Sequence, residues 1–317
     1  MSLRCSIGIM AHNEGANIGR LLKALVSQRT SEAMLSEILV VASGCTDNTE
    51  SIVREWATRD ARIRLLVQAK REGKASAVNL FLSQAREKIA VLCSADLLPT
   101  TDAIEQVVVA FADPEIGLAT ARPVPVNDPG TFMGFAAHML WDLHHHINLR
   151  SFKAGELIAF RKILERIPYH TVVDEASIEP VIRGQGYRAR YVPTAIVYNK
   201  GPETVKDFLR QRRRIYAGHL SEREALGYSV STMSGMKILG LVLRRMDWRP
   251  RPFLWTWSVA VLEAYGRVLG WRDYKKQRDH HIWEVAKTTK ELGKELSTEL
   301  SIDQAYHASA EAGRPSR

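Results

Sequence analysis

Short apolar runs alternate with helical patterns along the first 200 residues, and this alternation allows few folds. Four apolar runs are bounded by Gly, Asp, Asn or Ser and are typical of buried strands: Arg4–Met10, Glu37–Ala42, Ile63–Gln68 and Ile89–Cys93. Each is followed by a segment with helical apolar spacing: Ala16–Ser27, Thr46–Ala57, Lys74–Ala85 and Thr101–Phe111. This order predicts an α/β fold, with a mostly parallel sheet, right-handed crossovers and helices on both faces.

The pattern is less regular after Pro123. We expect a loop, a helix, a short strand, a second helix, a strand and a long helix, in that order. Pro193 in the last of these strands indicates a sheet edge or a bulge. The expected ranges are Val124–Gly130, Thr131–Leu149, Glu156–Phe160, Glu175–Gly186, Arg188–Tyr198 and a helix from near Pro202 through Gln211–Arg214.

The positive charge of the chain is concentrated in one segment. The net charge over 317 residues is +9, yet residues 1–200 carry only +2 and residues 201–290 carry +9. The same segment holds five of the seven tryptophans. Basic residues interleaved with indoles favour either nucleic acid or an anionic membrane surface as the partner. The uncharged run Pro252–Leu262 is too short to cross a bilayer, so we expect helices that lie in the membrane interface or pack on the core.

Polar side chains follow each predicted strand, at the sheet edge where α/β proteins bind ligands. They belong to the stretches His12–Glu14, Ser43–Asp47, Gln68–Lys74 and Ser94–Asp96. Asp96 is suited to holding Mg²⁺ or Mn²⁺ against a diphosphate, because hard cations prefer oxygen ligands. A turn or a helix cap is the alternative for Asp96, and a cap is the alternative for Asp47. Neither a P-loop nor a dinucleotide-binding fingerprint is present.

Two further groups of residues suit catalysis. Asp174 and Glu175 open a predicted helix, and the helix dipole favours carboxylates at that end. A carboxylate there could also deprotonate the hydroxyl of an acceptor. Gln211 and Arg214 share a helix face, either to stabilise a leaving diphosphate or as part of a solvated basic face. Adjacent helical residues point about 100° apart, so His144–His146 cannot all bind one ion.

The order of these segments resembles the family 2 inverting glycosyltransferases of GT-A fold. The similarity covers about Leu3 to Leu220 and includes the Gln-x-x-Arg-Trp signature of the synthase branch, here RQRRRIYAG. The other similar segments are IMAHNEGANIGRLLKAL, VVASGCTDNTESIV, REGKASAVN, LCSADLLP, KAGELIAFRK and VVDEASIEPVIRGQGYRARYVPTAIVY.

The resemblance implies a role for each matching position. A nucleoside-diphosphate sugar would contact Ala11, Asn13, Glu14, Ser43, Asp47, Lys74, Ser94, Ala95, Asp96, Gln211 and Arg214. Asp96 would bind the Mg²⁺ or Mn²⁺ cofactor. Glu175, beside Asp174, would act as the base, and Arg214 would stabilise the leaving group. The acceptor side would include Gly155, Glu156, Trp141 and His145, although ordinary helix histidines are the alternative for the last.

Several positions depart from the family pattern. Ser94–Ala95–Asp96 replaces Asp-x-Asp, and Ala42 and Ser43 replace aspartates that are common in base recognition. Asp174–Glu175 reverses the usual Glu-Asp order, and Asn199 stands where many relatives have a histidine metal ligand. Ile215 replaces the tryptophan that packs on the growing chain in processive synthases, which favours a single transfer.

We therefore expect three regions: a GT-A catalytic domain over 1–225, a basic, Trp-rich helical region over 226–290 and a polar tail over 291–317. The expected reaction is sugar transfer to a hydroxyl of a lipid-linked or membrane-presented acceptor. The expected location is cytoplasmic and peripheral, on the inner face of the cell membrane, with an anionic lipid surface rather than nucleic acid as partner. The alternatives are a nucleotidyltransferase acting on a sugar phosphate and a non-catalytic membrane-associated adaptor.

Overall fold

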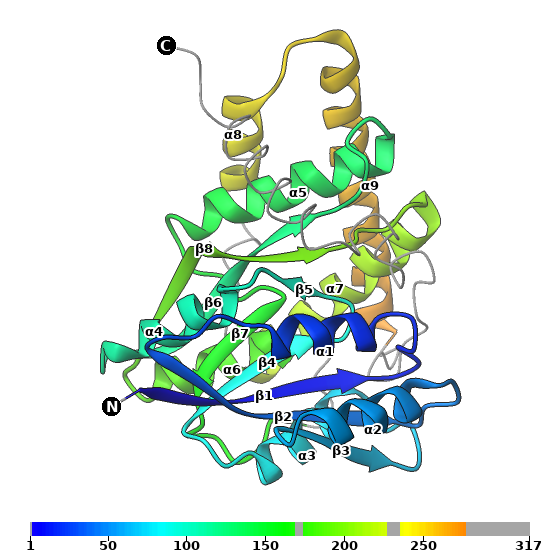
Figure 1. Cartoon of the computed structure of the whole chain (residues 1–317). Helices are drawn as coiled ribbons and strands as arrows, with labels where there is room; N and C mark the ends of the chain where they lie inside the picture. The colour runs from blue at the N-terminus through cyan, green and yellow to red at the C-terminus, as the bar shows by residue number, and fades with distance from the viewer. Residues whose placement is uncertain (1, 169–173, 227–234, 277–317) are drawn as a thin grey trace.

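Eight strands form one sheet in the described part of the chain (Figure 1). The structure is a computed structural model and describes residues 2–168, 174–226 and 235–276. The strands are β1 Leu3–Ala11, β2 Ala33–Ser43, β3 Ile63–Gln68, β4 Ile89–Ser94, β5 Leu98–Pro99, β6 Ile116–Pro125, β7 Leu157–Arg161 and β8 Arg188–Asn199. The helices are α1 Ile18–Val26, α2 Thr49–Arg59, α3 Lys74–Gln84, α4 Ala103–Val109, α5 Phe132–Asn148, α6 Asp174–Gly184, α7 Val205–Leu226, α8 Gly235–Arg245 and α9 Pro250–Lys275.

The sheet separates two hydrophobic cores, because alternate residues of a strand point to opposite faces. One core includes Ile7 and Val40 and is covered by α1, α2 and α4. The other includes Val41, Leu92 and Phe160 and is covered by α3 and α6. The expected α/β fold with helices on both faces is therefore confirmed, and both core faces are lined mainly by Val, Ile, Leu and Ala.

The strand order is β3-β2-β1-β4-β7-β6-β8-β5. Parallel pairing joins β1 with β2, β2 with β3, β1 with β4 and β6 with β8. The pairs β4–β7, β6–β7 and β5–β8 are antiparallel, so the sheet is mixed. The order along the chain reverses between β1 and β4, and ligands of α/β proteins bind at such a switch point.

The sequence analysis did not identify β6, and it assigned a loop to begin at Val124. The strand instead runs through Pro125, paired with both β7 and β8. Its prolines cannot donate to a ladder, which hid the strand from a pattern-based prediction. The bulge expected around Pro193 is confirmed, because Thr120 pairs with Tyr191 while Arg122 pairs with Ile196.

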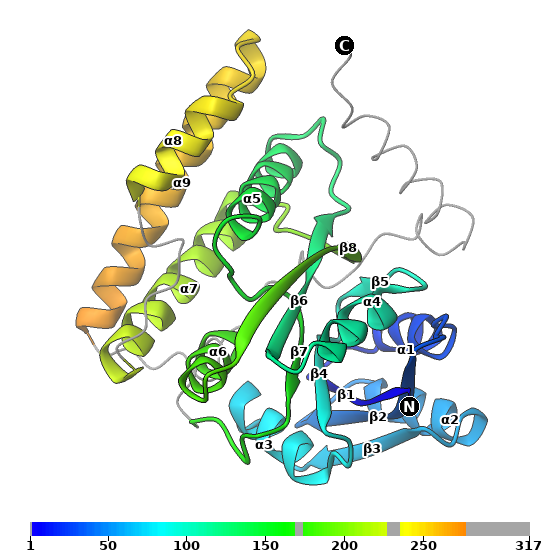
Figure 2. The same ribbon diagram turned by 90° about the vertical axis from the view of Figure 1, so that its left-hand side faces the viewer.

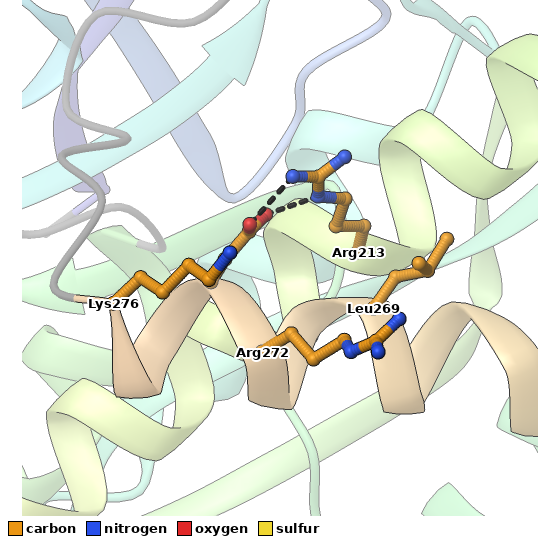
Figure 3. Close-up of a pocket in the computed structure, with 5 residues that line it drawn as sticks. Arg213, Leu269, Arg272 and Lys276 are labelled. Carbon is orange, nitrogen blue, oxygen red and sulfur yellow. Dashed lines mark hydrogen bonds and ion pairs between the residues drawn. The ribbon is translucent and has the colours of Figure 1, made fainter.

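Helix α9 packs closely along α7 (Figure 2). A Cβ atom at Gly266 would lie 2.7 Å from Arg212 Cβ, and one at Gly270 would lie 2.6 Å from the Arg213 carbonyl oxygen. Arg213 also donates two hydrogen bonds to the buried Asp273 carboxylate of α9 (Figure 3). The two glycines therefore permit the close approach, and the ion pair fixes it.

No helix within the described ranges is long and apolar enough to cross a bilayer. The expected tail over 291–317 and Trp283 lie outside the described residues. The division into three regions stays a prediction.

Substituting alanine for a helical glycine tests the α7–α9 contact. Gly240 of α8 has no heavy atom within 4 Å of an added Cβ, so Gly240→Ala should leave stability unchanged or raise it by about 0.5–1 kcal/mol. Gly270→Ala should instead destabilise by about 1–3 kcal/mol, since its Cβ meets backbone. Urea unfolding followed by circular dichroism measures both, and stabilisation by Gly270→Ala would contradict this packing.

Candidate active site

The loops after β1 and β2 are held together by Asp47. One carboxylate oxygen accepts a hydrogen bond from the Gly15 N–H at 2.9 Å, and the other accepts from the Thr49 N–H at 3.0 Å and the Thr49 hydroxyl at 2.5 Å. Burial raises the pKa of Asp47, but these hydrogen bonds outweigh it and the pKa is lowered overall. Asp47 is thus ionised and joins the two loops, although the N-cap position of α2 is the next residue, Asn48.

Asn13 joins the same two loops. Its backbone is left-handed, with φ of 54°, a conformation that asparagine tolerates better than most residues. Its side-chain oxygen accepts from the Thr46 N–H at 2.8 Å, and the adjacent His12 Nδ1 lies 2.7 Å from the Ser43 carbonyl oxygen. Glu14 is buried and bonded to the Asn17 side chain at 3.1 Å. This edge is therefore preorganised where Ala11 and Ser43 end their strands.

Two buried oxygens at this edge lack a hydrogen-bond partner among the described residues: Ser43 Oγ and Gln68 Oε1. Ser43 ends β2 and Gln68 ends β3, and the two residues are paired in the ladder. Buried polar atoms without a partner are rare, and a bound water, ion or ligand group would satisfy these two. The sequence analysis placed Gln68 at this edge but did not select it as a ligand-binding residue.

Asp96 follows β4 and lies among cations. Burial raises its pKa above the ordinary value, and nearby Lys74, Arg214 and Arg20 oppose that rise. Lys74 is the first residue of α3, so the positive end of that helix faces the same region. The structure thus brings together three residues predicted from three separate motifs, and it adds Arg20 of α1, which the sequence analysis missed.

Two more oxygen-bearing side chains lie near Asp96. Burial raises the pKa of Cys93, and Asp96 and Glu156 raise it further, which places Glu156 by the end of β4. Asn199 ends β8, next to the Tyr198–Leu98 pair and hence beside the turn that carries Asp96. Its Oδ1 is buried and accepts no hydrogen bond from a described residue.

A divalent cation fits this donor set. No group of three or more His, Cys, Asp or Glu side chains that could hold a metal occurs in the described ranges. Mg²⁺ and Mn²⁺ are, however, usually held by one or two protein oxygens together with substrate phosphates and water. The Asp96 carboxylate and the unpartnered Asn199 oxygen meet that requirement, in place of the histidine ligand.

The basic run on α7 serves several partners rather than one. Arg210 pairs with Asp207 at 3.3 Å, Arg212 lies 3.8 Å from Glu263 of α9, and Arg213 pairs with Asp273. Gln211 accepts from Arg212 at 3.2 Å, and Arg214 is the member that acts on Asp96. The run is therefore not one solvated basic face, and the role of Gln211 and Arg214 at a leaving diphosphate stays a prediction.

Asp174 and Glu175 begin α6 as expected, but their side chains lie outside the described residues. Their backbone lies at the amino end of a helix that packs on β6, β7 and β8. The assignment of Glu175 as the base stays a prediction.

The three adjacent histidines of α5 have three different partners, in line with their different directions on the helix. His144 is buried near Asn148, and His146 lies 2.8 Å from the Asp142 carbonyl oxygen. His145 Nδ1 lies 2.7 Å from the Tyr191 hydroxyl. Burial lowers the pKa of His144 to about 3 and that of His145 to about 4, so both are neutral at pH 7.

The end of β6 carries a half-buried arginine beside these histidines. Arg122 lowers the pKa of His145 and opposes the burial that raises the pKa of Tyr191 to about 12. It forms no hydrogen bond or ion pair with any described residue. The Gly155 N–H donates to Thr120 Oγ1 at 3.0 Å, and Trp141 packs edge-on against His144. The predicted acceptor-side residues are thus neighbours, with an unpaired cation among them.

Comparison with known proteins was made on sequence and on structure. The chain is 24% identical to a probable glycosyltransferase, YdaM, of Bacillus subtilis over 68% of this chain and 55% of that protein. It is 25% identical to a dolichol-phosphate mannosyltransferase of Mycosarcoma maydis over 47% of this chain and 62% of that protein. It thus spans little more than half the length of these curated relatives.

Two solved structures share the fold. The mannosyltransferase PcManGT of Pyrobaculum calidifontis, in complex with GDP-Man and Mn²⁺, gives a TM-score of 0.55 at 22% identity over 89% of this chain and 84% of that one. Glucosyl-3-phosphoglycerate synthase of Mycobacterium tuberculosis, in complex with Mg²⁺ and UDP, gives 0.51 at 18% identity over 72% and 81%.

The sequence pattern of one family matches more than half of the chain. Its description is Glycosyl transferase family 2, and the matched residues are 6–181, which include the ends of β1, β2 and β4. The chain therefore belongs to glycosyl transferase family 2, and its fold is the GT-A fold.

Proposed function

We propose that this glycosyltransferase moves one sugar from a nucleoside-diphosphate sugar to a hydroxyl of a lipid-linked acceptor at a membrane surface, with inversion. The observation that carries the proposal is the cluster of Asp96, Lys74, Arg214 and Arg20 at the switch point of the sheet. The three cations can bind the phosphate oxygens of a diphosphate, and the carboxylate can bind its metal ion. The unpartnered Ser43 and Gln68 oxygens support a nucleoside beside it.

The proposed mechanism is a single displacement. Glu175 takes the proton of the acceptor hydroxyl while its oxygen attacks the anomeric carbon, and the bond from that carbon to the diphosphate oxygen breaks. Lys74 and Arg214 offset the negative charge that develops on the leaving diphosphate, the usual work of preorganised cations. Ile215 next to Arg214 offers no aromatic platform for a growing glycan, which supports a single transfer.

Asp96 and Asn199 are the proposed protein ligands of Mg²⁺ or Mn²⁺. When bound, the ion would supply Lewis-acid stabilisation of the diphosphate. The named relatives that bind Mn²⁺ or Mg²⁺ with GDP-Man or UDP support this assignment.

The acceptor side supports a substrate that carries phosphate. Arg122 has no carboxylate partner among the described residues, and neutral His145 and Tyr191 offer hydrogen bonds beside it. A guanidinium without a carboxylate partner among the described residues can donate two parallel hydrogen bonds to a phosphate. A sugar linked to lipid through phosphate has that anion, and the name of the dolichol-phosphate relative agrees with it.

Donor binding can be tested without an acceptor. UDP or GDP with Mn²⁺ should raise the melting temperature, because a ligand at 100 times its Kd stabilises by about 2.7 kcal/mol. Asp96→Ala should lose the Mn²⁺-dependent part of the shift. Asp113→Ala is the control, since Asp113 precedes β6 and pairs with Arg188 and Arg190. An unchanged Mn²⁺-dependent shift in Asp96→Ala would contradict the metal assignment.

The base can be tested by the slow hydrolysis of the donor, in which water replaces the acceptor. Glu175→Gln should lower the hydrolysis rate by about 10²–10⁴-fold, the usual contribution of a general base, while the nucleotide-induced melting shift stays unchanged. Asp174→Asn should have a much smaller effect. A larger loss in Asp174→Asn than in Glu175→Gln would transfer the base role to Asp174.

A further inference from the structure

Helix α9 is apolar on both of its long faces. Its inner face, with Val259, Gly266 and Gly270, is buried. Apolar residues three or four positions apart also occupy the opposite side, where they are 41–66% exposed: Leu254, Trp257, Val261, Tyr265, Val268 and Trp271. An apolar stripe on a helix is normally packed against another surface. The outer face of α9 is therefore a surface without its partner.

The exposed surface continues onto α8. Leu239 and Leu243 of α8 are 47% and 45% exposed, and Trp248 in the connecting turn is 74% exposed. Trp248 stacks on Phe253, which packs edge-on against Trp257. Nine of the fifteen large exposed hydrophobic side chains among the described residues belong to these two helices and their turn. Figures 1 and 2 show this pair extending past the body of the sheet.

The inner side of α9 already packs on the domain, so the outer face is not a surface that closes onto it. Trp255 packs against Phe132 and Phe135 of α5 at ring distances of 5.8 and 5.5 Å. Asp273 is paired with Arg213 near the other end of the helix (Figure 3). The outer face is consequently presented by a helix that is fixed at both ends.

The segment that carries the apolar face has a positive net charge. Residues 235–276 contain nine basic and three acidic residues. All three acidic groups are engaged, because Asp247 pairs with Arg249, Glu263 with Arg267 and Asp273 with Arg213. Arg272 and Lys276 border the hollow in Figure 3, and Lys275 lies 6.0 Å from the ring centre of exposed Trp271. The formal net charge of this segment is therefore +6, of which one charge, that of Arg245, is paired with Asp142 of α5.

We propose that the outer face of α8 and α9, with Trp248, docks on an anionic lipid bilayer and lies in its interface. Exposed Trp and Tyr with Arg and Lys are the residues that such interfacial helices use. A second copy of the chain fits less well, since two such faces would bring like charges together. This inference rests on the proposed lipid-linked acceptor. Since α9 is fixed to α7, docking would also hold Arg214 at a set orientation to the membrane.

The experiment is vesicle flotation of the full chain without any nucleotide, so it does not depend on sugar transfer. We expect binding to vesicles of phosphatidylcholine with 30% phosphatidylglycerol, and weaker binding in 0.5 M NaCl because salt screens the surface charge. The double variant Leu254→Glu with Val261→Glu should weaken binding by about ten-fold or more, since two apolar side chains would no longer leave water for the interface and two negative charges would face the anionic lipid.

Met34→Glu is the matched control, because Met34 is 46% exposed but lies at the start of β2. It should bind vesicles like the wild type. The melting shift with UDP or GDP and Mn²⁺ is measured in each variant, so loss of membrane docking is distinguished from loss of the donor site. Absence of wild-type binding, or equal binding by the double variant, would overturn the proposal. The proposal would also be overturned if light scattering showed a dimer that Val261→Glu dissociates and if no variant bound vesicles.

Discussion

The parallel pairing of β1 with both β2 and β4 is the constraint on which the rest of the site depends. Strands buried on both faces can pair in parallel only if helices return the chain across the sheet, so every strand of this group ends at the same edge. The loops that follow must then form a common surface. Asp47 and Asn13 bind those loops together before any ligand arrives, which leaves Ser43, Gln68 and Asp96 at a preformed edge.

The extent to which sequence predicted this structure differs from element to element. Strands such as Ile89–Ser94 have a continuous apolar run, and burial on both faces leaves few other places for it. Strand β6 has the same burial but ends in Arg-Pro-Val-Pro, and its pairing depends on neighbours that are distant in the chain. Asp96 and Lys74 could be placed at one edge from strand order alone, since each follows a clear strand.

Side-chain partners were harder to predict, because they depend on which helix lies opposite. Four consecutive basic or amide residues on α7 look alike in sequence, yet Arg213 meets a buried carboxylate of α9 while Arg214 acts on Asp96. Asn199 could be chosen as a metal-ligand candidate only from the structure, which shows that its buried side-chain oxygen accepts no hydrogen bond from a described residue. Core packing, one of the two alternatives for the C-terminal helices, holds for the inner face of α9. Its outer face is exposed, and the interfacial alternative for that face stays a prediction.

The central claim is that a nucleoside-diphosphate sugar binds at the carboxyl edge of β1, β2 and β4. Hydrogen–deuterium exchange, followed with and without UDP or GDP and Mn²⁺, locates the ligand directly. The account predicts slower exchange at residues 11–15, 43–47, 68–74 and 94–97, and unchanged exchange in the outer turns of α8. Protection confined to other segments, or none at a nucleotide concentration that raises the melting temperature, would contradict it.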